Sequence, residues 1–170
     1  MPVNEPGFER LRTILDMYVV TDADIAGPLL KRVGQTHREQ MRRVFAGESQ
    51  GELYPWPRLS PAYALWKRRF LGTKGKILVL SGEMKERFTK ASRTEYIQRY
   101  EKPYIQLGAS DPIAAKHFLG VAPLPKRDMI TKSKKQLREL VQTIVDWWNK
   151  ERLPQLQRGE ARLLRRQWKP

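Results

Sequence analysis

The apolar residues of the N-terminal third recur at helical spacing, and this pattern predicts two helices. The first covers residues 8–18, and the second carries apolar positions from residue 25 to residue 45. Thr21 and Asp22 are residue types that favour the N-terminal cap of the second helix. Pro28 comes early enough to fit the first turn of this helix, where a proline costs no hydrogen bond. The N-terminal region is therefore predicted to be helical.

Four further helices are predicted in the rest of the chain. Three are short and cover residues 61–70, 83–88 and 113–118, each behind residues that favour a cap or a first turn. The fourth begins after Ser133 and has the clearest amphipathic pattern of the chain. We expect its apolar stripe to face the core, and this stripe comprises Leu137, Leu140, Val141, Ile144, Val145 and Trp148.

Short segments with strand-like composition lie between the helices. Residues 95–100 and 103–107 combine alternation with β-favouring side chains, and they predict a hairpin. Residues 77–80 are apolar but too short to distinguish a strand from a helix start. Residues 128–130 are a candidate closing strand. Together these elements predict an α+β fold in which a small antiparallel sheet packs with several helices.

The chain is expected to form one domain with arms. We expect an N-terminal helical region over residues 1–52, an α+β core over residues 53–152 and a basic C-terminal tail over residues 153–170. A chain of 170 residues can bury roughly 70% of the surface that its unfolded form exposes, which is enough for a substantial core.

The composition excludes several kinds of site. The chain has no cysteine, so it has no disulfide, no thiolate metal site and no cysteine nucleophile. Its two histidines, His37 and His117, are far apart and lack metal-ligand spacing, so we expect no metal and no cofactor. No run approaches the ~20 apolar residues of a membrane span. The N-terminus lacks the pattern of a signal peptide, so we expect a protein of the cytoplasm without membrane contact.

The net charge changes the picture more than any other bulk property. The 33 lysines and arginines outnumber the 18 acidic residues, which gives a formal charge of +15. Such a surplus favours a polyanion or an acidic protein as a neighbour. The alternative is that the basic surface only keeps the protein in solution.

Part of this charge lies in a stretch that contains no acidic residue, from Leu53 to Gly82. One hypothesis is that the stretch faces DNA, the channel of an assembly or an acidic partner, and the alternative is a solvated surface. The glycines of residues 72–76 do not have the spacing of a phosphate-binding loop. The candidate DNA-facing or channel-facing residues are Lys67, Arg68, Arg69, Lys74 and Lys76.

No set of residues has the pattern of a catalytic site. Ser81 is followed by Gly82 but lacks a nucleophile elbow and a supporting base, so we interpret it as a helix cap. His117 has no acid or second histidine at useful spacing, which favours a packed, structural histidine. We therefore expect a protein that is not an enzyme.

The C-terminal part holds candidates for a subunit interface. Trp147 and Trp148 are adjacent, so only one of them fits the predicted core stripe, and Trp147 is expected near its edge. Exposed tryptophan is enriched at interfaces, although Trp147 could instead cover a loop of its own subunit. The candidate interface residues are Trp147, Arg162, Arg165, Arg166 and Trp168.

An ordered series of short motifs runs through the middle of the chain. A Trp-x-x-Leu-x-x-x-Tyr-x-x-x-Lys run precedes an apolar segment that ends in Ser-Gly. A short strand ending in glycine, an Ala-x-x-His-x-x-Gly helix and an arginine follow. This order resembles the phage virion morphogenesis family, the tail-completion proteins of Mu-like and P2-like contractile-tailed phages. The matching positions are Trp56, Leu59, Tyr63, Lys67, Ser81, Gly82, Gly108, Ala114, His117, Gly120 and Arg127.

The resemblance implies a structural protein of the virion. Such a subunit would form a ring, by resemblance a hexamer, at the head-proximal end of the tail and join the tail to the head around the DNA channel. Its implied partners are copies of itself, other neck, tail-tube or connector proteins, and non-specifically the packaged DNA. Its location would be the neck of the virion, after assembly in the host cytoplasm.

Two other classes of protein compete with this interpretation. The first is a stand-alone, sequence-independent nucleic-acid-binding protein, although no helix-turn-helix, zinc finger or RNA-binding aromatic motif supports it. The second is a small hydrolase, which the missing acid–base pair argues against.

Overall fold

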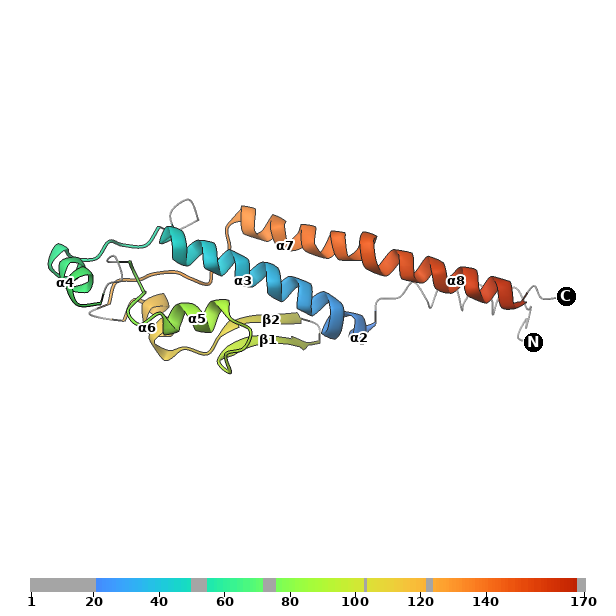
Figure 1. Cartoon of the computed structure of the whole chain (residues 1–170), viewed down its shortest axis with the longest axis horizontal. Helices are drawn as coiled ribbons and strands as arrows, with labels where there is room; N and C mark the ends of the chain where they lie inside the picture. The colour runs from blue at the N-terminus through green and yellow to red at the C-terminus, as the bar shows by residue number, and fades with distance from the viewer. Residues whose placement is uncertain (1–20, 50–54, 72–75, 103, 122–123, 168–170) are drawn as a thin grey trace.

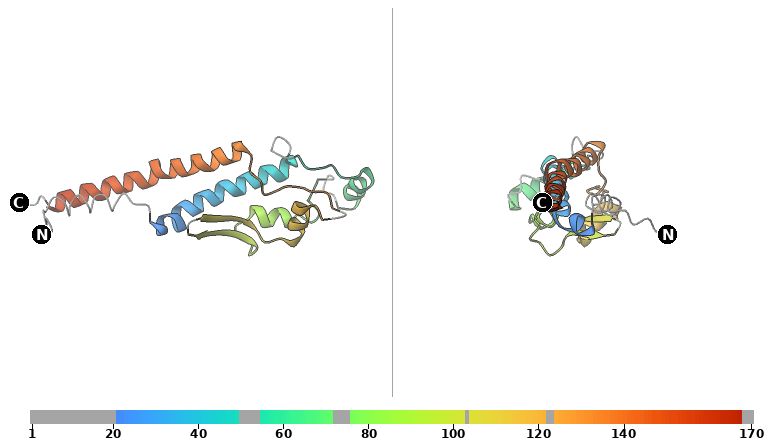
Figure 2. Two further views of the ribbon diagram at one scale, coloured as in Figure 1. Left: turned by 180° about the vertical axis from the view of Figure 1, so that it is seen from behind. Right: turned by 90° about the vertical axis from the view of Figure 1, so that its right-hand side faces the viewer.

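One central helix separates the two other layers of the molecule. In the computed structural model this helix is α3 (Leu30–Gly47), with a long helical rod on one side and a β-hairpin with short helices on the other (Figures 1 and 2). The structure describes residues 21–49, 55–71, 76–102, 104–121 and 124–167, with only the backbone for residues 160 and 163–167. The predicted α+β class is confirmed, because a small antiparallel sheet packs against helices.

The start of the central helix follows its sequence closely. Thr21 caps α2 (Asp22–Asp24), and a capping box joins the Thr21 and Asp24 side chains to each other's backbone N–H groups. A π-helical turn, η1 (Ile25–Leu29), connects α2 to α3. The sequence predicted Pro28 in the first turn of the helix. It lies inside the π-helical turn instead. Because proline has no N–H to donate, the wider turn accommodates it.

The β-hairpin packs against α3 through a close and polar contact. It consists of β1 (Tyr96–Glu101) and β2 (Tyr104–Ala109), with Tyr96 opposite Ala109. A Cβ atom at Gly34 of α3 would lie 2.1 Å from the Gln98 side-chain oxygen, so the glycine allows this approach. The Gln98 oxygen accepts a hydrogen bond from Arg38 at 2.7 Å, which holds the side chain in place.

Within the described residues the sheet has only these two strands. The candidate closing strand at residues 128–130 is therefore corrected, and residues 77–80, which the sequence left open between a strand and a helix start, form neither. Residues 77–80 form a turn, in which Leu78 has a φ of 56° and the Ile77 N–H donates to the Glu48 carboxylate. Residues 128–130 also turn, because the Asp128 carboxylate accepts hydrogen bonds from the two N–H groups that follow Met129. A side-chain acceptor therefore replaces a strand partner at both places. It is the distant Glu48 at residues 77–80 and the segment's own Asp128 at residues 128–130.

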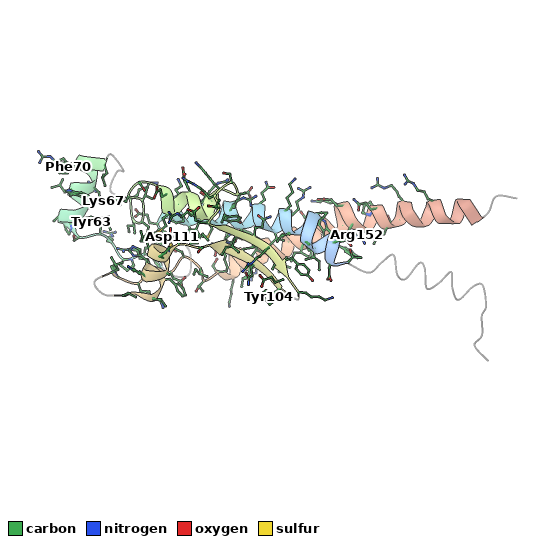
Figure 3. All side chains as sticks on the ribbon, turned by 90° about the horizontal axis from the view of Figure 1, so that it is seen from below. Tyr63, Lys67, Phe70, Tyr104, Asp111 and Arg152 are labelled. Carbon is green, nitrogen blue, oxygen red and sulfur yellow. The ribbon has the colours of Figure 1, made fainter. Side chains whose placement is uncertain are left out.

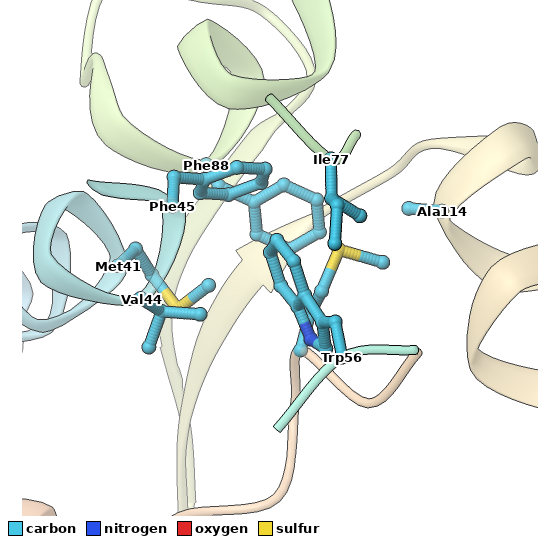
Figure 4. Packing of buried hydrophobic residues seen from close by; sticks show 8 residues of the cluster. Met41, Val44, Phe45, Trp56, Ile77, Phe88 and Ala114 are labelled. Carbon is cyan, nitrogen blue, oxygen red and sulfur yellow. The ribbon is translucent and has the colours of Figure 1, made fainter. Parts of the chain in front are cut away.

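The main hydrophobic core joins α3 to the loops and short helices beside it (Figure 4). At its centre Phe45 contacts the rings of Trp56 and Phe88, with ring centroids 5.5 and 6.1 Å apart. The Trp56 indole N–H donates to the Asp128 carbonyl oxygen at 2.8 Å. The expected boundary near residue 52 does not divide this core, which comprises Met41, Val44, Phe45, Trp56, Ile77, Phe88, Ala114 and Met129.

The C-terminal part forms one long helical rod. Its first helix, α7 (Lys134–Trp147), begins at the predicted cap Ser133, which forms a capping box with Gln136. A π-helical turn, η2 (Trp148–Arg152), leads into α8 (Leu153–Gln167). The basic segment predicted as a tail after Leu153 is therefore a helix, and it projects beyond the hairpin (Figure 1). None of the described helices is both long enough and apolar enough to cross a membrane.

The prediction for the buried face of α7 is wrong. Leu137, Val141, Ile144 and Val145 are exposed, with exposed fractions of 50, 58, 41 and 42%, whereas Trp147 is only 5% exposed. The other two residues of the predicted stripe, Leu140 and Trp148, are half-buried.

Polar contacts with α3 decide which face of α7 turns inward. Thr36 and Thr143 share a hydrogen bond of 2.8 Å between their hydroxyls, and the fully buried Gln40 donates to the Gln136 carbonyl oxygen at 2.8 Å. Beyond them Trp147 packs with Leu29 and Val33 in a second small core. The apolar stripe of α7 is therefore left on the outside.

Three short helices and their connections complete the fold. They are α4 (Pro61–Leu71), α5 (Glu83–Thr89) and α6 (Pro112–Leu119), and they confirm three of the predicted helices. The helix predicted over residues 8–18 and most of the loop at residues 72–76 lie outside the described residues.

The different burial of Phe45 and Leu137 predicts that their replacement by alanine lowers the stability by very different amounts. Phe45 is 1% exposed and Leu137 is half-exposed. Phe45→Ala should lower the free energy of unfolding by about 3–5 kcal/mol, because it leaves a cavity among Trp56 and Phe88. Leu137→Ala should change it by about 0.5 kcal/mol or less, as is usual for surface positions. Urea unfolding of dilute protein measures both, and equal losses would contradict the observed orientation of α7.

His37 predicts a pH dependence of stability. The side chain is buried between α3 and β1, and burial is the main reason that its pKa falls from 6.5 to about 3, with smaller contributions from Lys132 and Arg38. Between these two pH values the His37 side chain is protonated in the unfolded chain and neutral in the folded chain. The contribution of His37 to the free energy of unfolding is therefore fully present above pH 6.5 and is lost as the pH falls towards 3. The slope from this group is up to about 1.4 kcal/mol per pH unit.

Replacement of the histidine isolates this contribution. His37→Gln should show a shallower loss of unfolding free energy between pH 7 and pH 4 than the unaltered chain, because glutamine does not titrate. The carboxylates titrate in both proteins and cancel in the comparison. Parallel curves for the two proteins would refute a depressed pKa at His37.

Candidate functional site: a basic cleft between α4, α5 and α6

A cleft of about 620 Å³ opens where α4, α5 and α6 meet. Three separate segments of the chain supply its walls, and the segments lie together at one end of the molecule (Figure 1). The structure thereby brings together most of the motif positions that the sequence had singled out. Those that line the cleft are Leu59, Tyr63, Lys67, Ser81, Gly82, His117 and Arg127.

Lys67 reaches the cleft from the inner side of α4. The Ser60 hydroxyl accepts a weak hydrogen bond of 3.4 Å from the Tyr63 N–H and so supports the first turn of this helix. The Lys67 side chain is 2% exposed, and its ammonium donates to the Lys76 carbonyl oxygen at 2.5 Å. Lys67 therefore lies inside the subunit, which corrects its assignment to a DNA-facing surface.

The start of α5 differs in detail from the prediction. Gly82 is the N-cap residue, with a φ of 92° that only glycine adopts without strain. Ser81 precedes the cap, and its hydroxyl accepts a long hydrogen bond of 3.4 Å from the Glu83 N–H. Ser81 thus supports the helix start without being its cap.

Asp111 anchors the opposite wall of the cleft. Its carboxylate accepts hydrogen bonds of 2.8 Å from the N–H groups of Ile113 and Ala114, which caps α6. The same carboxylate binds the Arg87 guanidinium of α5 at 2.8 Å. Asp111 therefore ties the beginning of α6 to α5.

Gly120 returns the chain to the cleft after α6. It ends the helix with a φ of 70°, and a Cβ atom there would lie 3.0 Å from the Lys126 Cβ. Behind this turn the Arg127 N–H donates to the His117 carbonyl oxygen at 2.8 Å. The turn thus places the histidine and the arginine of the motif side by side.

The Arg127 guanidinium is buried with few partners. One Nη atom lies 3.3 Å from His117 Nδ1, and the other donates weakly to the Pro57 carbonyl oxygen at 3.4 Å. Its Nε atom has no hydrogen-bond partner within the described part of the chain. Burial lowers the pKa of both Arg127 and Lys67. Burial, and then the charge of Arg127, also lower the pKa of His117.

The arrangement favours binding over covalent chemistry. The His117 ring faces a cation and not a nucleophile, while the described contact of the Ser81 hydroxyl is a backbone N–H. Among the described residues no three acidic, histidine or cysteine side chains lie close enough to hold a metal ion. Buried cations with incomplete hydrogen bonding suit an anionic group, because such a group would supply the missing acceptors.

Among the described residues, the other candidates lie outside the cleft. Arg68, Arg69 and Lys76 are exposed, so the proposed basic set is split between the cleft and the solvent. Lys74 lies outside the described residues. Trp56 belongs to the hydrophobic core and does not line the cleft.

The candidate interface set is also divided. Trp147 is buried within its own subunit, so the premise that it lies at the edge of the core face is wrong. Arg162 is exposed on α8. The side chains of Arg165, Arg166 and Trp168 lie outside what the structure describes.

The sequence reasoning missed two features of this end of the molecule. The first is the bridge between Arg87 and Asp111, although the Asp-Pro pair at a helix start was a usable signal for Asp111. The second is the exposed aromatic surface of α4, on which Tyr63 stacks with Trp66 at a centroid distance of 5.6 Å. Figure 3 shows Tyr63, Lys67 and Phe70 along α4 at one end of the molecule.

Comparison with protein-family models, with curated proteins and with solved structures finds no match. The resemblance to tail-completion proteins therefore rests on the order of the motif residues.

The cap of α6 generates a prediction with an internal control. Asp111→Ala should lower the free energy of unfolding by about 1–3 kcal/mol, because two N–H groups, one buried and one half-buried, lose their acceptor. Asp111→Asn should cost less, because the amide oxygen still accepts both hydrogen bonds. Thermal or urea unfolding compares the two variants, and equal losses would show that the charge and not the cap is what matters.

Proposed function

We propose that this chain is a structural subunit that assembles with copies of itself into a ring at the neck of a contractile-tailed phage. The ring would complete the tail and join it to the head around the DNA channel. The observation that carries the proposal is the exposed apolar stripe on the outer face of α7, formed by Leu137, Val141, Ile144 and Val145. This set is called the α7 stripe below.

The α7 stripe has the spacing of a helix interface. Residues 137, 141 and 144 follow one another at intervals of four and three, the seven-residue pattern by which apolar side chains line one side of a helix. A soluble subunit that left this row in water would expose a contiguous apolar surface, which monomers rarely do. A second protein surface is therefore expected to cover it.

A different apolar surface lies on α4. Leu65 and Phe70 are 66 and 65% exposed, and Trp66 is 43% exposed beside them. α4 stands at one end of the elongated molecule, whereas α7 runs along one side (Figures 1 and 2). A ring of identical subunits needs two unlike surfaces, since each copy offers one face to each neighbour. The α4 surface and the α7 stripe meet this need.

The motif order supports the choice of a neck protein among other ring-forming proteins. The motif residues build the core and the cleft, which are features of the subunit itself. The surplus positive charge suits a position beside DNA, because basic side chains neutralise phosphate without reading bases. The exposed residues that could serve in this way include Arg68, Arg69, Lys76, Arg158 and Arg162. On this proposal the protein binds and assembles, and it catalyses no reaction.

A charge placed in the α7 stripe tests assembly. Val141→Lys combined with Ile144→Lys should leave folding intact, since both side chains are exposed, but it should prevent packing because the interface would bury unpaired charge. Native mass spectrometry with the other neck and tail proteins should give multiples of 20.0 kDa for the unaltered chain and 20.0 kDa for the variant.

Gln142→Lys is the matched control. It adds one lysine, half the charge of the double variant, to the same helix at an exposed position outside the α7 stripe, so assembly should persist. A variant that assembles as well as this control would remove the α7 stripe from the interface. An unaltered chain that stays monomeric within intact particles, or that binds duplex DNA as a monomer without sequence preference, would favour the stand-alone nucleic-acid-binding alternative.

A further inference from the structure

We infer that the cleft between α4, α5 and α6 binds an acidic side chain of a partner protein, presented between apolar residues. The cleft is separate from the α7 stripe, and it combines charged with apolar side chains where the α7 stripe is apolar only. The inference therefore goes beyond ring assembly and adds a second kind of contact to the molecule.

Two buried cations of the cleft lack a carboxylate. Lys67 and Arg127 are 2 and 5% exposed, and neither forms an ion pair with an acidic side chain in the described part of the chain. The Lys67 ammonium donates to the Lys76 carbonyl oxygen and lies 5.8 Å from the centroid of the Tyr63 ring, while the nearby Glu48 carboxylate accepts a hydrogen bond from a backbone N–H. Arg127 Nε has no acceptor among the described residues. Buried charges in this condition are costly, and an incoming carboxylate would relieve the cost.

The net charge of the residues that line the cleft limits how much negative charge a bound ligand can carry. Four cationic residues line it, and two acidic residues, Glu83 and Asp111, offset part of their charge. The surplus of two positive charges suits one or two carboxylates. A nucleic-acid backbone carries a regular row of phosphates, and the acidic wall would repel several of them. The charge balance thus favours an acidic side chain over a row of phosphates.

The apolar part of the lining indicates what surrounds that acidic side chain. Half-buried and exposed apolar side chains line the cleft beside the cations. Its volume of about 620 Å³ lies within the range of roughly 300–1,000 Å³ that binding pockets have. A glutamate or aspartate with apolar neighbours would fill both parts of the cleft. The apolar residues are Leu59, Leu78, Leu80, Met84, Ile113 and Leu124.

The first test uses the unaltered chain and two synthetic peptides. One peptide carries a single glutamate between leucines, and the other has glutamine in place of the glutamate. Nitrogen-detected NMR follows the Arg127 Nε–H signal during titration. The glutamate peptide should shift this signal in a saturable way and bind about tenfold or more tightly than the glutamine peptide, because a charged hydrogen bond distinguishes them.

The second test compares two substitutions on the same helix. Lys67→Met removes the buried charge and keeps the length of the side chain, whereas Arg68→Met removes an exposed charge one position away. Lys67→Met should weaken binding of the glutamate peptide by about tenfold or more, and Arg68→Met should leave it unchanged. If Lys67→Met does not fold, the Arg127 titration of the unaltered chain still decides the question.

Three results would overturn the inference. Equal binding of the two peptides would show that charge plays no part. Equal weakening by the two substitutions would assign the effect to net charge and not to the cleft. An identical Arg127 shift with inorganic phosphate, at the same concentration, would make the cleft a small-anion site instead of a site for a partner's side chain.

Discussion

The hydrogen-bonded contact between α3 and α7 decides which face of α7 is buried and which is exposed. Gln40 is fully buried and donates to the Gln136 carbonyl oxygen, and the Thr36 and Thr143 hydroxyls bind each other further along the two helices. Apolar packing alone restricts the rotation of a helix only through the fit of its side chains, and these directional hydrogen bonds favour one rotation further. That rotation brings Trp147 inside and leaves the α7 stripe outside. The proposal of an assembling subunit depends on this result.

The same central helix also holds the other layer at a fixed distance. Gly34 lets the hairpin approach so closely that a side chain at this position would meet Gln98. Arg38 binds the Gln98 oxygen, and Phe45 at the end of α3 joins the main core. Because α3 fixes both neighbours, the short helices and loops that build the cleft have a rigid support. The cleft can therefore keep charged groups buried in defined positions.

The cleft buries positive charges that come from segments distant in the sequence. Lys67 comes from α4 and Arg127 from the loop after α6, sixty residues later in the chain. Each is removed from water by the packing of the other segments, and each has its pKa lowered by burial. On the inference drawn above, their incomplete hydrogen bonding suits a negatively charged group of a partner. The apolar surfaces on α4 and α7 are the ones that we propose for contacts between subunits.

The sequence by itself determined the local features of this protein. Caps such as Thr21, Asp111 and Ser133 predicted helix starts correctly, because capping depends on residues only three positions apart. Alternation predicted both strands of the hairpin, and the order of motifs pointed to residues that do meet in one cleft. The α+β class followed from these local elements.

Only the tertiary structure decided which surfaces face one another. The apolar stripe of α7 predicted a buried face, but hydrogen bonds with α3 selected the face that carries Gln136 and Trp147. Lys67 belonged by sequence to an exposed basic run, yet its ammonium reaches a carbonyl oxygen inside the subunit. Residues 77–80, which the sequence left open between a strand and a helix start, form a turn in which Ile77 donates to the distant Glu48 carboxylate. These outcomes depend on partners from distant parts of the chain, which periodicity and composition do not record.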